Sequence, residues 1–231
     1  MLNVHGKDIN GAITYHDEYR FRLIDAWGAD VKKVIKDFAS LPVDDTTGDP
    51  AEFTLTATEV GAGDSTAVLS DGEMLLTTAA NEDDGVNLQL KGESFKLENG
   101  KHVYFGIKAK VSDATETDLL VGLCITDTTL LGGLSDGIYF ECLDGSTAIS
   151  AVSEKDSTET TSSIGTMDTD YHVYEFEWTG STLRCYFDGT EIILPQTNIP
   201  DDEYLTPSIV FLTGDVALKT SNISWLRCIQ C

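Results

Sequence analysis

Positively charged residues are scarce in this 231-residue chain: Lys and Arg together number 15 against 39 Asp and Glu, a formal net charge of −24. So much negative charge repels phosphate backbones and anionic lipid headgroups, which argues against nucleic acid and membranes as partners. Long apolar runs are also missing, since no stretch approaches the roughly 18 consecutive apolar residues of a membrane span. The N-terminus lacks the basic and apolar regions of a secretory signal, so we expect neither membrane insertion nor secretion.

Cysteines are few, and their five positions lack the regular spacing of a secreted disulfide framework. We interpret them as reduced thiols of a protein made in the cytosol. Cys124, Cys142 and Cys185 lie in apolar or alternating runs, where cysteine packs as a small hydrophobe. Cys228 and Cys231 form a C-x-x-C pair, but a structural zinc site needs four ligands and no second pair exists. The sequence therefore predicts no metal and no cofactor.

Signatures of catalysis are sparse. The best paired carboxylates are Glu175 and Glu177, which lie on one face of a predicted strand about 6.5 to 7 Å apart, a spacing that a glycosidase can use. Tyr174, Phe176 and Trp178 mark the other face of that strand as the core side. We therefore interpret the two glutamates as a solvated strand face. No catalytic residue is predicted, and the chain is predicted not to be an enzyme.

One acidic turn leaves an alternative open. Residues 81–85 (NEDDG) concentrate three carboxylates and an amide, the hard oxygen ligands that calcium prefers. The run lacks the spacing of an EF-hand loop, and an acidic turn is common in so acidic a chain. We favour the plain turn and predict no metal site here.

From about residue 51 onward the chain has the pattern of an all-β sandwich. Apolar and polar residues alternate in 52–58, 86–90, 102–111 and 174–178, so each run predicts a strand with one buried face. Five Asp-Gly dipeptides fall between or beside such runs, and this pair supplies the positive φ angles of tight hairpin turns. Asp188-Gly189 separates two β-rich runs by two residues, which predicts a type I′ hairpin.

Residues 1–50 are different, and the polar cluster 44–50 (DDTTGDP) predicts a boundary near residue 50. We therefore divide the chain into an N-terminal arm, 1–50, and a sandwich domain, 51–231. Apolar residues at i, i+3, i+4 and i+7 over Val31–Phe38 predict one short amphipathic helix within the arm. The first 27 residues show no core pattern of their own and suggest an extended arm.

Two resemblances add to this interpretation. Residues 171–192 (YHVYEFEWTGSTLRCYFDGTEI) resemble the strand and hairpin signature of concanavalin-A-like jelly-roll sandwiches. Family-16 glucanases share that fold and carry an E-x-D-x-E catalytic strand, which is absent from this sequence. Residues 84–192, with the phrases VSDATETD, GLCITDTT and DGIYF, resemble a family of phage virion structural proteins. That second resemblance implies a virion component of decoration or unassigned function.

These observations lead to one main functional hypothesis and two alternatives. The main hypothesis is a non-enzymatic capsid decoration (cement) protein of a bacteriophage. On this hypothesis it is made in the host bacterial cytoplasm, lies on the capsid surface of the virion, and binds the major capsid protein and copies of itself as a homotrimer. The alternative is a carbohydrate-binding module of a phage fibre or spike, and a glycan hydrolase ranks third because its motif is missing.

The predicted partner-binding residues lie in the arm, since aromatic and arginine side chains concentrate binding energy at interfaces. They are Tyr15, Tyr19, Arg20, Phe21, Arg22 and Trp27.

Overall fold

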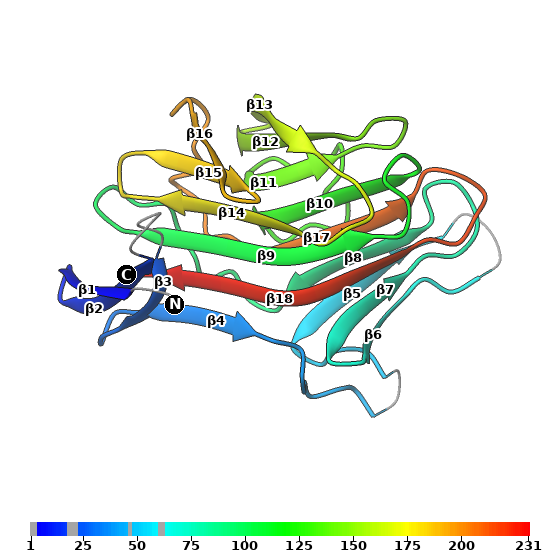
Figure 1. The fold of residues 1–231 in the computed structure, drawn as a ribbon, viewed down its shortest axis with the longest axis horizontal. Helices are drawn as coiled ribbons and strands as arrows, with labels where there is room; N and C mark the ends of the chain where they lie inside the picture. The colour runs from blue at the N-terminus through cyan, green and yellow to red at the C-terminus, as the bar shows by residue number, and fades with distance from the viewer. Residues whose placement is uncertain (1–3, 18–22, 46–47, 60–62) are drawn as a thin grey trace.

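The computed structural model describes residues 4–17, 23–45, 48–59 and 63–231. Strands are its regular elements, and no helix that could span a bilayer occurs in the part of the chain that it describes. Two large antiparallel sheets stack face to face, and a small three-stranded sheet lies at one end of them, beside the C-terminal end of β18 (Figure 1). The predicted all-β sandwich is confirmed.

The first large sheet has seven strands among the described residues. In spatial order they are β13 (Thr158–Thr166), β12 (Ala148–Lys155), β11 (Gly137–Cys142), β10 (Thr117–Cys124), β17 (Thr206–Thr213), β8 (Gly85–Leu90) and β5 (Phe53–Thr58). We call it the seven-stranded sheet.

The second large sheet has eight described strands. Seven follow one another as β16 (Thr190–Leu194), β15 (Leu183–Phe187), β14 (His172–Trp178), β9 (Val103–Val111), β18 (Thr220–Gln230), β7 (Glu73–Thr77) and β6 (Thr66–Ser70). The eighth, β4 (Lys32–Lys36), pairs with the C-terminal half of β18. We call it the eight-stranded sheet.

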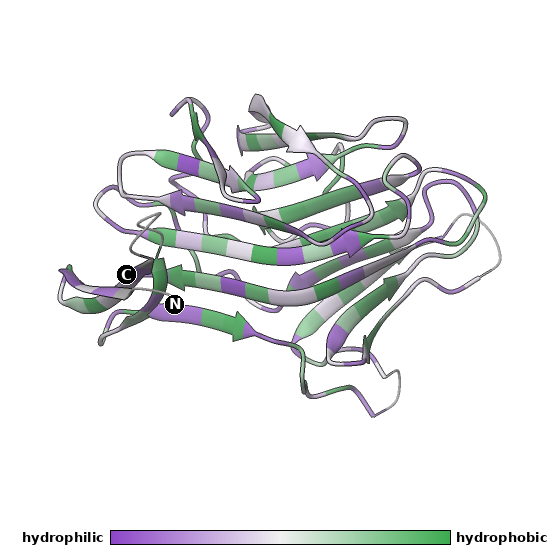
Figure 2. Ribbon diagram, in the orientation of Figure 1, coloured by the Kyte–Doolittle hydropathy of each residue, from purple (hydrophilic) through white to green (hydrophobic). Residues whose placement is uncertain are grey.

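The core lies between the two large sheets, where the alternation predicted from the sequence places the apolar side chains. Phe105 of β9 stacks on Phe176 of β14 with ring centroids 5.3 Å apart. Phe140 of β11 reaches across the sandwich to Tyr174 of β14 at 5.8 Å. Trp178 is buried in the same cluster, as predicted. Hydrophobic and hydrophilic residues alternate along β9 and β18, whereas β10 is hydrophobic over most of its length (Figure 2).

The Asp188-Gly189 hairpin is confirmed. Residues Asp188 and Gly189 join β15 to β16 with φ angles of 48° and 78°, which are the left-handed values of a type I′ turn. The cysteines in the strands also behave as predicted, since Cys124, Cys142 and Cys185 are buried among apolar side chains.

The predicted helix over Val31–Phe38 is wrong, because β4 occupies that segment. Its backbone pairs antiparallel with Leu226–Gln230 of β18, and Val34 packs against the core while Ile35 stays 45% exposed. Side chains that are branched at Cβ, such as those of Val34 and Ile35, favour a strand over a helix. The open edge of β18 also provides hydrogen-bond partners for the backbone N–H and C=O groups of β4. The spacing of four apolar residues in the sequence contains no information about that distant strand edge.

The first 27 residues are not a simple extended arm, which corrects that prediction too. β1 (Val4–Ile9) and β2 (Ala12–Asp17) form a hairpin, and β3 (Leu23–Trp27) pairs with β2. The turn is Asn10-Gly11, with φ angles of 52° and 81°. A small apolar cluster attaches this three-stranded sheet to the outer face of the eight-stranded sheet. Its members are Ile9, Ala12, Leu23, Ala26, Tyr104, Ile229 and Cys231.

Candidate functional site

The outer face of the seven-stranded sheet carries a cleft, which we call the acidic cleft. Its cavity has a volume of about 250 Å³. Strands β10 to β13 form the floor, and the 130–134 loop that precedes β11 forms one wall. The lining side chains combine leucines with carboxyl and hydroxyl groups, and they include Leu120, Leu130, Leu134, Tyr139, Glu141, Glu154 and Glu159.

Strand alternation places the polar groups of β11 in this cleft. Ile138 and Phe140 face the sandwich core, so Tyr139 and Glu141 face outward. Glu154 of β12 and Glu159 of β13 are direct cross-strand neighbours on the same face. The Tyr139 hydroxyl donates a hydrogen bond to Glu154 Oε2 at 2.9 Å and lies 3.4 Å from Glu159 Oε1. Three adjacent strands therefore bring their acidic groups to one place.

The electrostatics of the acidic cleft favour the protonated form of Glu141. Burial, followed by the nearby carboxylates of Glu159 and Glu154, raises the pKa of Glu141 to about 7. Burial also raises the pKa of Glu154, although the hydrogen bond from Tyr139 opposes that shift. Glu141 thus titrates near neutral pH, which is the behaviour expected of a carboxyl that transfers protons.

A second buried carboxyl lies on the same sheet face, at the start of β10. Burial raises the pKa of Asp118 to about 6, while the hydrogen bond that it accepts from the Asp144 backbone N–H at 2.8 Å opposes the rise. Asp144 and Asp83 add negative charge nearby. The acidic character of the face therefore extends beyond the cleft itself.

The loop beside the acidic cleft also contains Gly133-Leu134-Ser135-Asp136-Gly137, which matches G-x-S-x-G. That motif acts on a sharp turn between a strand and a helix. Here it spans the loop before β11 and the first residue of that strand, and the Ser135 hydroxyl donates to the Asp136 carboxylate at 2.8 Å. The surroundings do not match those of a nucleophilic serine.

Glu175 and Glu177 lie on the outer face of the eight-stranded sheet, as their alternation with core residues predicted. They are not solvated, however, because their exposed fractions are only 4% and 5%. Tyr104 of β9 donates a hydrogen bond to Glu175 Oε1 at 2.7 Å. The interpretation of a solvated strand face is wrong, because the N-terminal sheet packs over this end of the sandwich.

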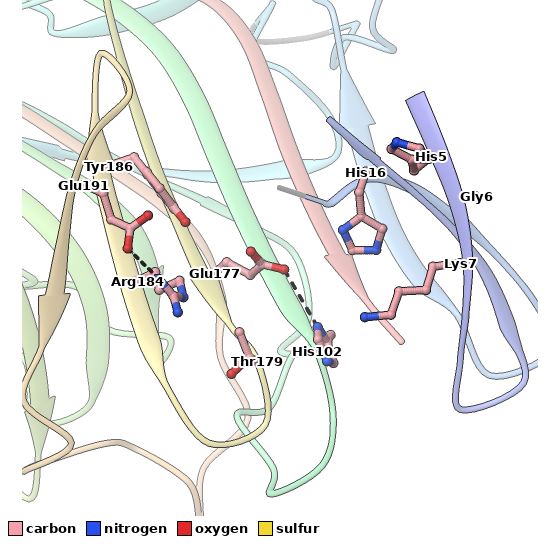
Figure 3. Close-up of a pocket in the computed structure, with 10 residues that line it drawn as sticks. All are labelled: His5, Gly6, Lys7, His16, His102, Glu177, Thr179, Arg184, Tyr186 and Glu191. Atoms are coloured by element: carbon pink, nitrogen blue, oxygen red, sulfur yellow. Dashed lines mark hydrogen bonds and ion pairs between the residues drawn. The ribbon is translucent and has the colours of Figure 1, made fainter. Parts of the chain in front are cut away.

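A second cleft lies between the β1–β2 hairpin and this outer face, and we call it the hairpin cleft. Its cavity has a volume of about 580 Å³. His5, Lys7 and His16 enter from the hairpin. Facing them are His102, which directly precedes β9, and Glu177 of β14 (Figure 3). Arg184, Tyr186 and Glu191 extend the lining along β15 and β16 (Figure 3).

The partner-binding residues predicted for the arm fall into two groups. Tyr15 and Trp27 are exposed on the three-stranded sheet, by 38% and 61%, and Lys33 Nζ lies 3.9 Å from the centroid of the Trp27 ring. Tyr19, Arg20, Phe21 and Arg22 lie outside the described residues. The role of all six in partner binding stays a prediction.

None of the acidic cleft residues was predicted from the sequence. Alternation in 137–142 (GIYFEC) already places Tyr139 and Glu141 on one strand face. The convergence with Glu154 and Glu159 depends on the pairing of β11, β12 and β13, which no local pattern reveals. The turn 81–85, considered for calcium, is held by a hydrogen bond from Asn81 Nδ2 to Asp84 Oδ2 at 2.8 Å.

Comparisons with known proteins identify the fold. No family model and no curated protein sequence matches the chain. Among solved structures, a protein described with endo-acting O-glycanases of the human gut microbiota has a TM-score of 0.62 at 16% identity, over 86% of this chain and 98% of its own. The β-glucanase of Bacillus licheniformis has a TM-score of 0.61 at 14% identity, over 84% and 96%. The Emp46p carbohydrate recognition domain has a TM-score of 0.58 at 13% identity, over 84% of this chain and 97% of its own.

These neighbours confirm the concanavalin-A-like jelly-roll sandwich. They overturn the prediction that the chain is not an enzyme, because glycoside hydrolases share its fold, among them an endo-1,3-β-glucanase of Streptomyces sioyaensis with a TM-score of 0.60. The missing E-x-D-x-E strand was too narrow a ground for that prediction, since carboxyls from three strands converge here instead. Nothing in the comparisons supports the resemblance to phage virion proteins.

Proposed function

We propose that this chain binds carbohydrate in the acidic cleft. The observation that carries the proposal is the cleft itself, in which the hydroxyl of Tyr139 and the carboxyls of Glu141 and Glu154 converge beside leucine side chains. Carboxylates accept hydrogen bonds from sugar hydroxyls, and leucines offer apolar contact to the C–H faces of a sugar ring. The shared fold with glycanases and a carbohydrate recognition domain supports the same conclusion.

The charge of the cleft defines the class of glycan. Glu141, Glu154 and Glu159 lie within one lining, and the chain carries a net charge of −24. Such a surface repels anionic sugars, because like charges in a poorly solvated cleft cost free energy. We therefore infer that the acidic cleft takes a neutral oligosaccharide.

A second candidate function is hydrolysis of a glycosidic bond. It is favoured by one specific observation, the pKa of Glu141 at about 7, which leaves a large protonated fraction at neutral pH. Protonated Glu141 would donate its proton to the leaving glycosidic oxygen as the C–O bond breaks. An ionised neighbour, Glu154 or Glu159, would activate water or attack the sugar carbon, and water would complete the hydrolysis.

The experiment that tests the binding proposal is a glycan array, followed by calorimetric titration of the best neutral oligosaccharide. At pH 8, where Glu141 is mostly ionised, we expect Glu141→Gln to weaken binding by about tenfold or more, because a hydrogen bond to a charged acceptor contributes on the order of 1.5 to 3 kcal/mol. Glu191→Gln is the matched control, since it removes the same charge from the eight-stranded sheet. Equal affinities for the wild type and Glu141→Gln would refute the placement of the glycan.

Release of reducing ends from the same oligosaccharide separates binding from hydrolysis. A hydrolase should lose turnover in Glu141→Gln and in Glu154→Gln, and wild-type turnover should fall as the pH rises past about 7, where Glu141 loses its proton. Binding without any release of reducing ends would leave the chain as a carbohydrate-binding module.

The capsid hypothesis stays a prediction that rests on sequence resemblance alone. It includes the virion location, the major capsid protein as partner, the homotrimer and a contact through the six arm residues Tyr15, Tyr19, Arg20, Phe21, Arg22 and Trp27. Glycan binding is compatible with a fibre or spike of a virion, which is the alternative drawn from the sequence. Binding of the purified protein to particles that lack it would support the shell contact, and no binding would refute it.

A further inference from the structure

The hairpin cleft is chemically unlike the rest of this acidic molecule. Three of the four histidines in the chain line it, together with Lys7 and Arg184. Two carboxylates also line the cleft, that of Glu177 beside His102 and that of Glu191 beside Arg184 (Figure 3). Because the chain as a whole has 15 Lys and Arg against 39 Asp and Glu, such a gathering of basic side chains is unusual.

The floor of the hairpin cleft contains an unsatisfied polar atom. Nδ1 of His102 is buried, and within the described residues it has no hydrogen-bond partner. Its nearest carboxylate oxygen, Glu177 Oε1, lies 3.7 Å away, which is too long for a hydrogen bond. Because this atom is buried, a ligand reaches it only after the His102 ring turns toward the cleft. A hydroxyl that then bridged His102 and Glu177 would be held favourably, since a buried polar atom without a partner costs free energy. A ligand hydroxyl can accept from one of them and donate to the other.

The two walls of the hairpin cleft offer different groups. The hairpin wall presents the exposed ammonium of Lys7, and the opposite wall presents Arg184, which forms an ion pair with Glu191 at 2.5 Å. That pair is exposed, so it is weak and can be exchanged for a ligand contact. Among the described residues no group of three or more His, Cys, Asp or Glu side chains is arranged to hold a metal ion. An organic ligand therefore fits the cleft better than a cation.

We propose that the hairpin cleft is a second ligand site, which binds an acidic sugar such as a uronic acid residue. The carboxylate of the sugar is held by Lys7 and Arg184, and its ring hydroxyls bridge His102 and Glu177. A cavity of about 580 Å³ is in the size range of small-molecule sites. This site goes beyond the proposed function, because it lies on the other large sheet and selects an anionic sugar, whereas the acidic cleft takes a neutral one.

The test compares a galacturonate tetramer with a neutral galactose tetramer by calorimetric titration on the full chain. We expect the acidic tetramer to bind, and Lys7→Gln and Arg184→Gln each to weaken it by about tenfold through loss of a charge-assisted hydrogen bond. Lys91→Gln is the matched control, because Lys91 lies after β8 and donates to the Ala51 carbonyl away from the cleft. It should leave the affinity unchanged.

Three outcomes would overturn the proposal. One is equal binding by Lys7→Gln, Arg184→Gln and the wild type, and another is no binding of the acidic tetramer at all. The third is sulfate alone displacing the tetramer at equal concentration, which would indicate a plain anion site without sugar recognition. Glu141→Gln separates the two sites, since it should weaken only the neutral oligosaccharide. The proposal for the acidic cleft and the proposal for the hairpin cleft can therefore be refuted independently.

Discussion

Replacing Glu141 with Gln should stabilise the protein at alkaline pH. In the folded state burial and neighbouring carboxylates raise the pKa of this carboxyl from 4.5 to about 7, so the fold disfavours its ionised form. A group whose folded pKa is raised contributes stability below the unfolded pKa and loses it as the pH rises through the folded pKa. The wild type should therefore lose stability between about pH 4.5 and pH 7, whereas Glu141→Gln has no such group to ionise.

The magnitude follows from the shift. Each pKa unit corresponds to about 1.4 kcal/mol, and integration of the linkage relation between pH 5 and pH 8 gives about 2.5 kcal/mol. The stability of Glu141→Gln relative to the wild type should rise by about this amount across that interval. The range also avoids the sequence pI of about 4.2, near which the protein carries little net charge.

Urea denaturation at pH 5, 6, 7 and 8 measures this difference in the free energy of unfolding. Glu191→Gln is the control, since it removes the same charge from an exposed ion pair with Arg184 and should give a nearly constant offset. A difference between Glu141→Gln and the wild type that changes by less than about 0.5 kcal/mol from pH 5 to pH 8 would refute the reasoning. Glu141 would then be solvated, and the acidic cleft would not be a poorly hydrated site.

Two further substitutions test the packing beneath the clefts. Trp178→Ala should destabilise the fold by about 3 to 5 kcal/mol through a core cavity, while Trp178→Phe, which chiefly loses the 2.9 Å hydrogen bond to the Glu98 carbonyl, should cost about 1 to 2 kcal/mol. A loss below about 1 kcal/mol for Trp178→Ala in urea titrations would mean that the indole is not in the core. Gly122→Ala should cost about 2 to 3 kcal/mol, because its Cβ would lie 2.2 Å from the Ile138 carbonyl oxygen and 2.6 Å from Tyr139 Cα. Gly6→Ala, whose Cβ meets nothing within 4 Å, is the control, and equal melting temperatures for the two variants would contradict the close packing of β10 on β11.

The sequence was sufficient to predict the sandwich, because its strands keep a strict alternation and its turns have their own residue signature. Alternation in 102–111 and 174–178 and the Asp188-Gly189 turn each correspond to an observed element. The N-terminal hairpin was also accessible, since Asn10-Gly11 is a strong turn signal, but the lack of a core pattern around it favoured an extended arm. Its apolar residues find their partners on the sandwich, at Tyr104 and Ile229.

The wrongly predicted helix and the candidate sites are features that local sequence patterns could not predict, because they depend on contacts between residues distant in the sequence. Val31–Phe38 has helical periodicity, yet the open edge of β18 decides its conformation, and that edge is formed by residues almost 200 positions later. The acidic cleft likewise depends on strand pairing that brings Glu141, Glu154 and Glu159 onto one face. The local sequence around each of these glutamates does not show that the three side chains converge in the folded protein. A missing motif was therefore weak ground for excluding catalysis.

The most direct test of carbohydrate binding in the acidic cleft is to map the amide NMR shifts that a bound neutral oligosaccharide causes. The largest shifts should fall on the residues of β10 to β13 that face the cleft, around Tyr139, Glu141 and Glu154, and should diminish in Glu141→Gln. Shifts confined to the eight-stranded sheet, or no shift with any neutral glycan of the array, would contradict the account.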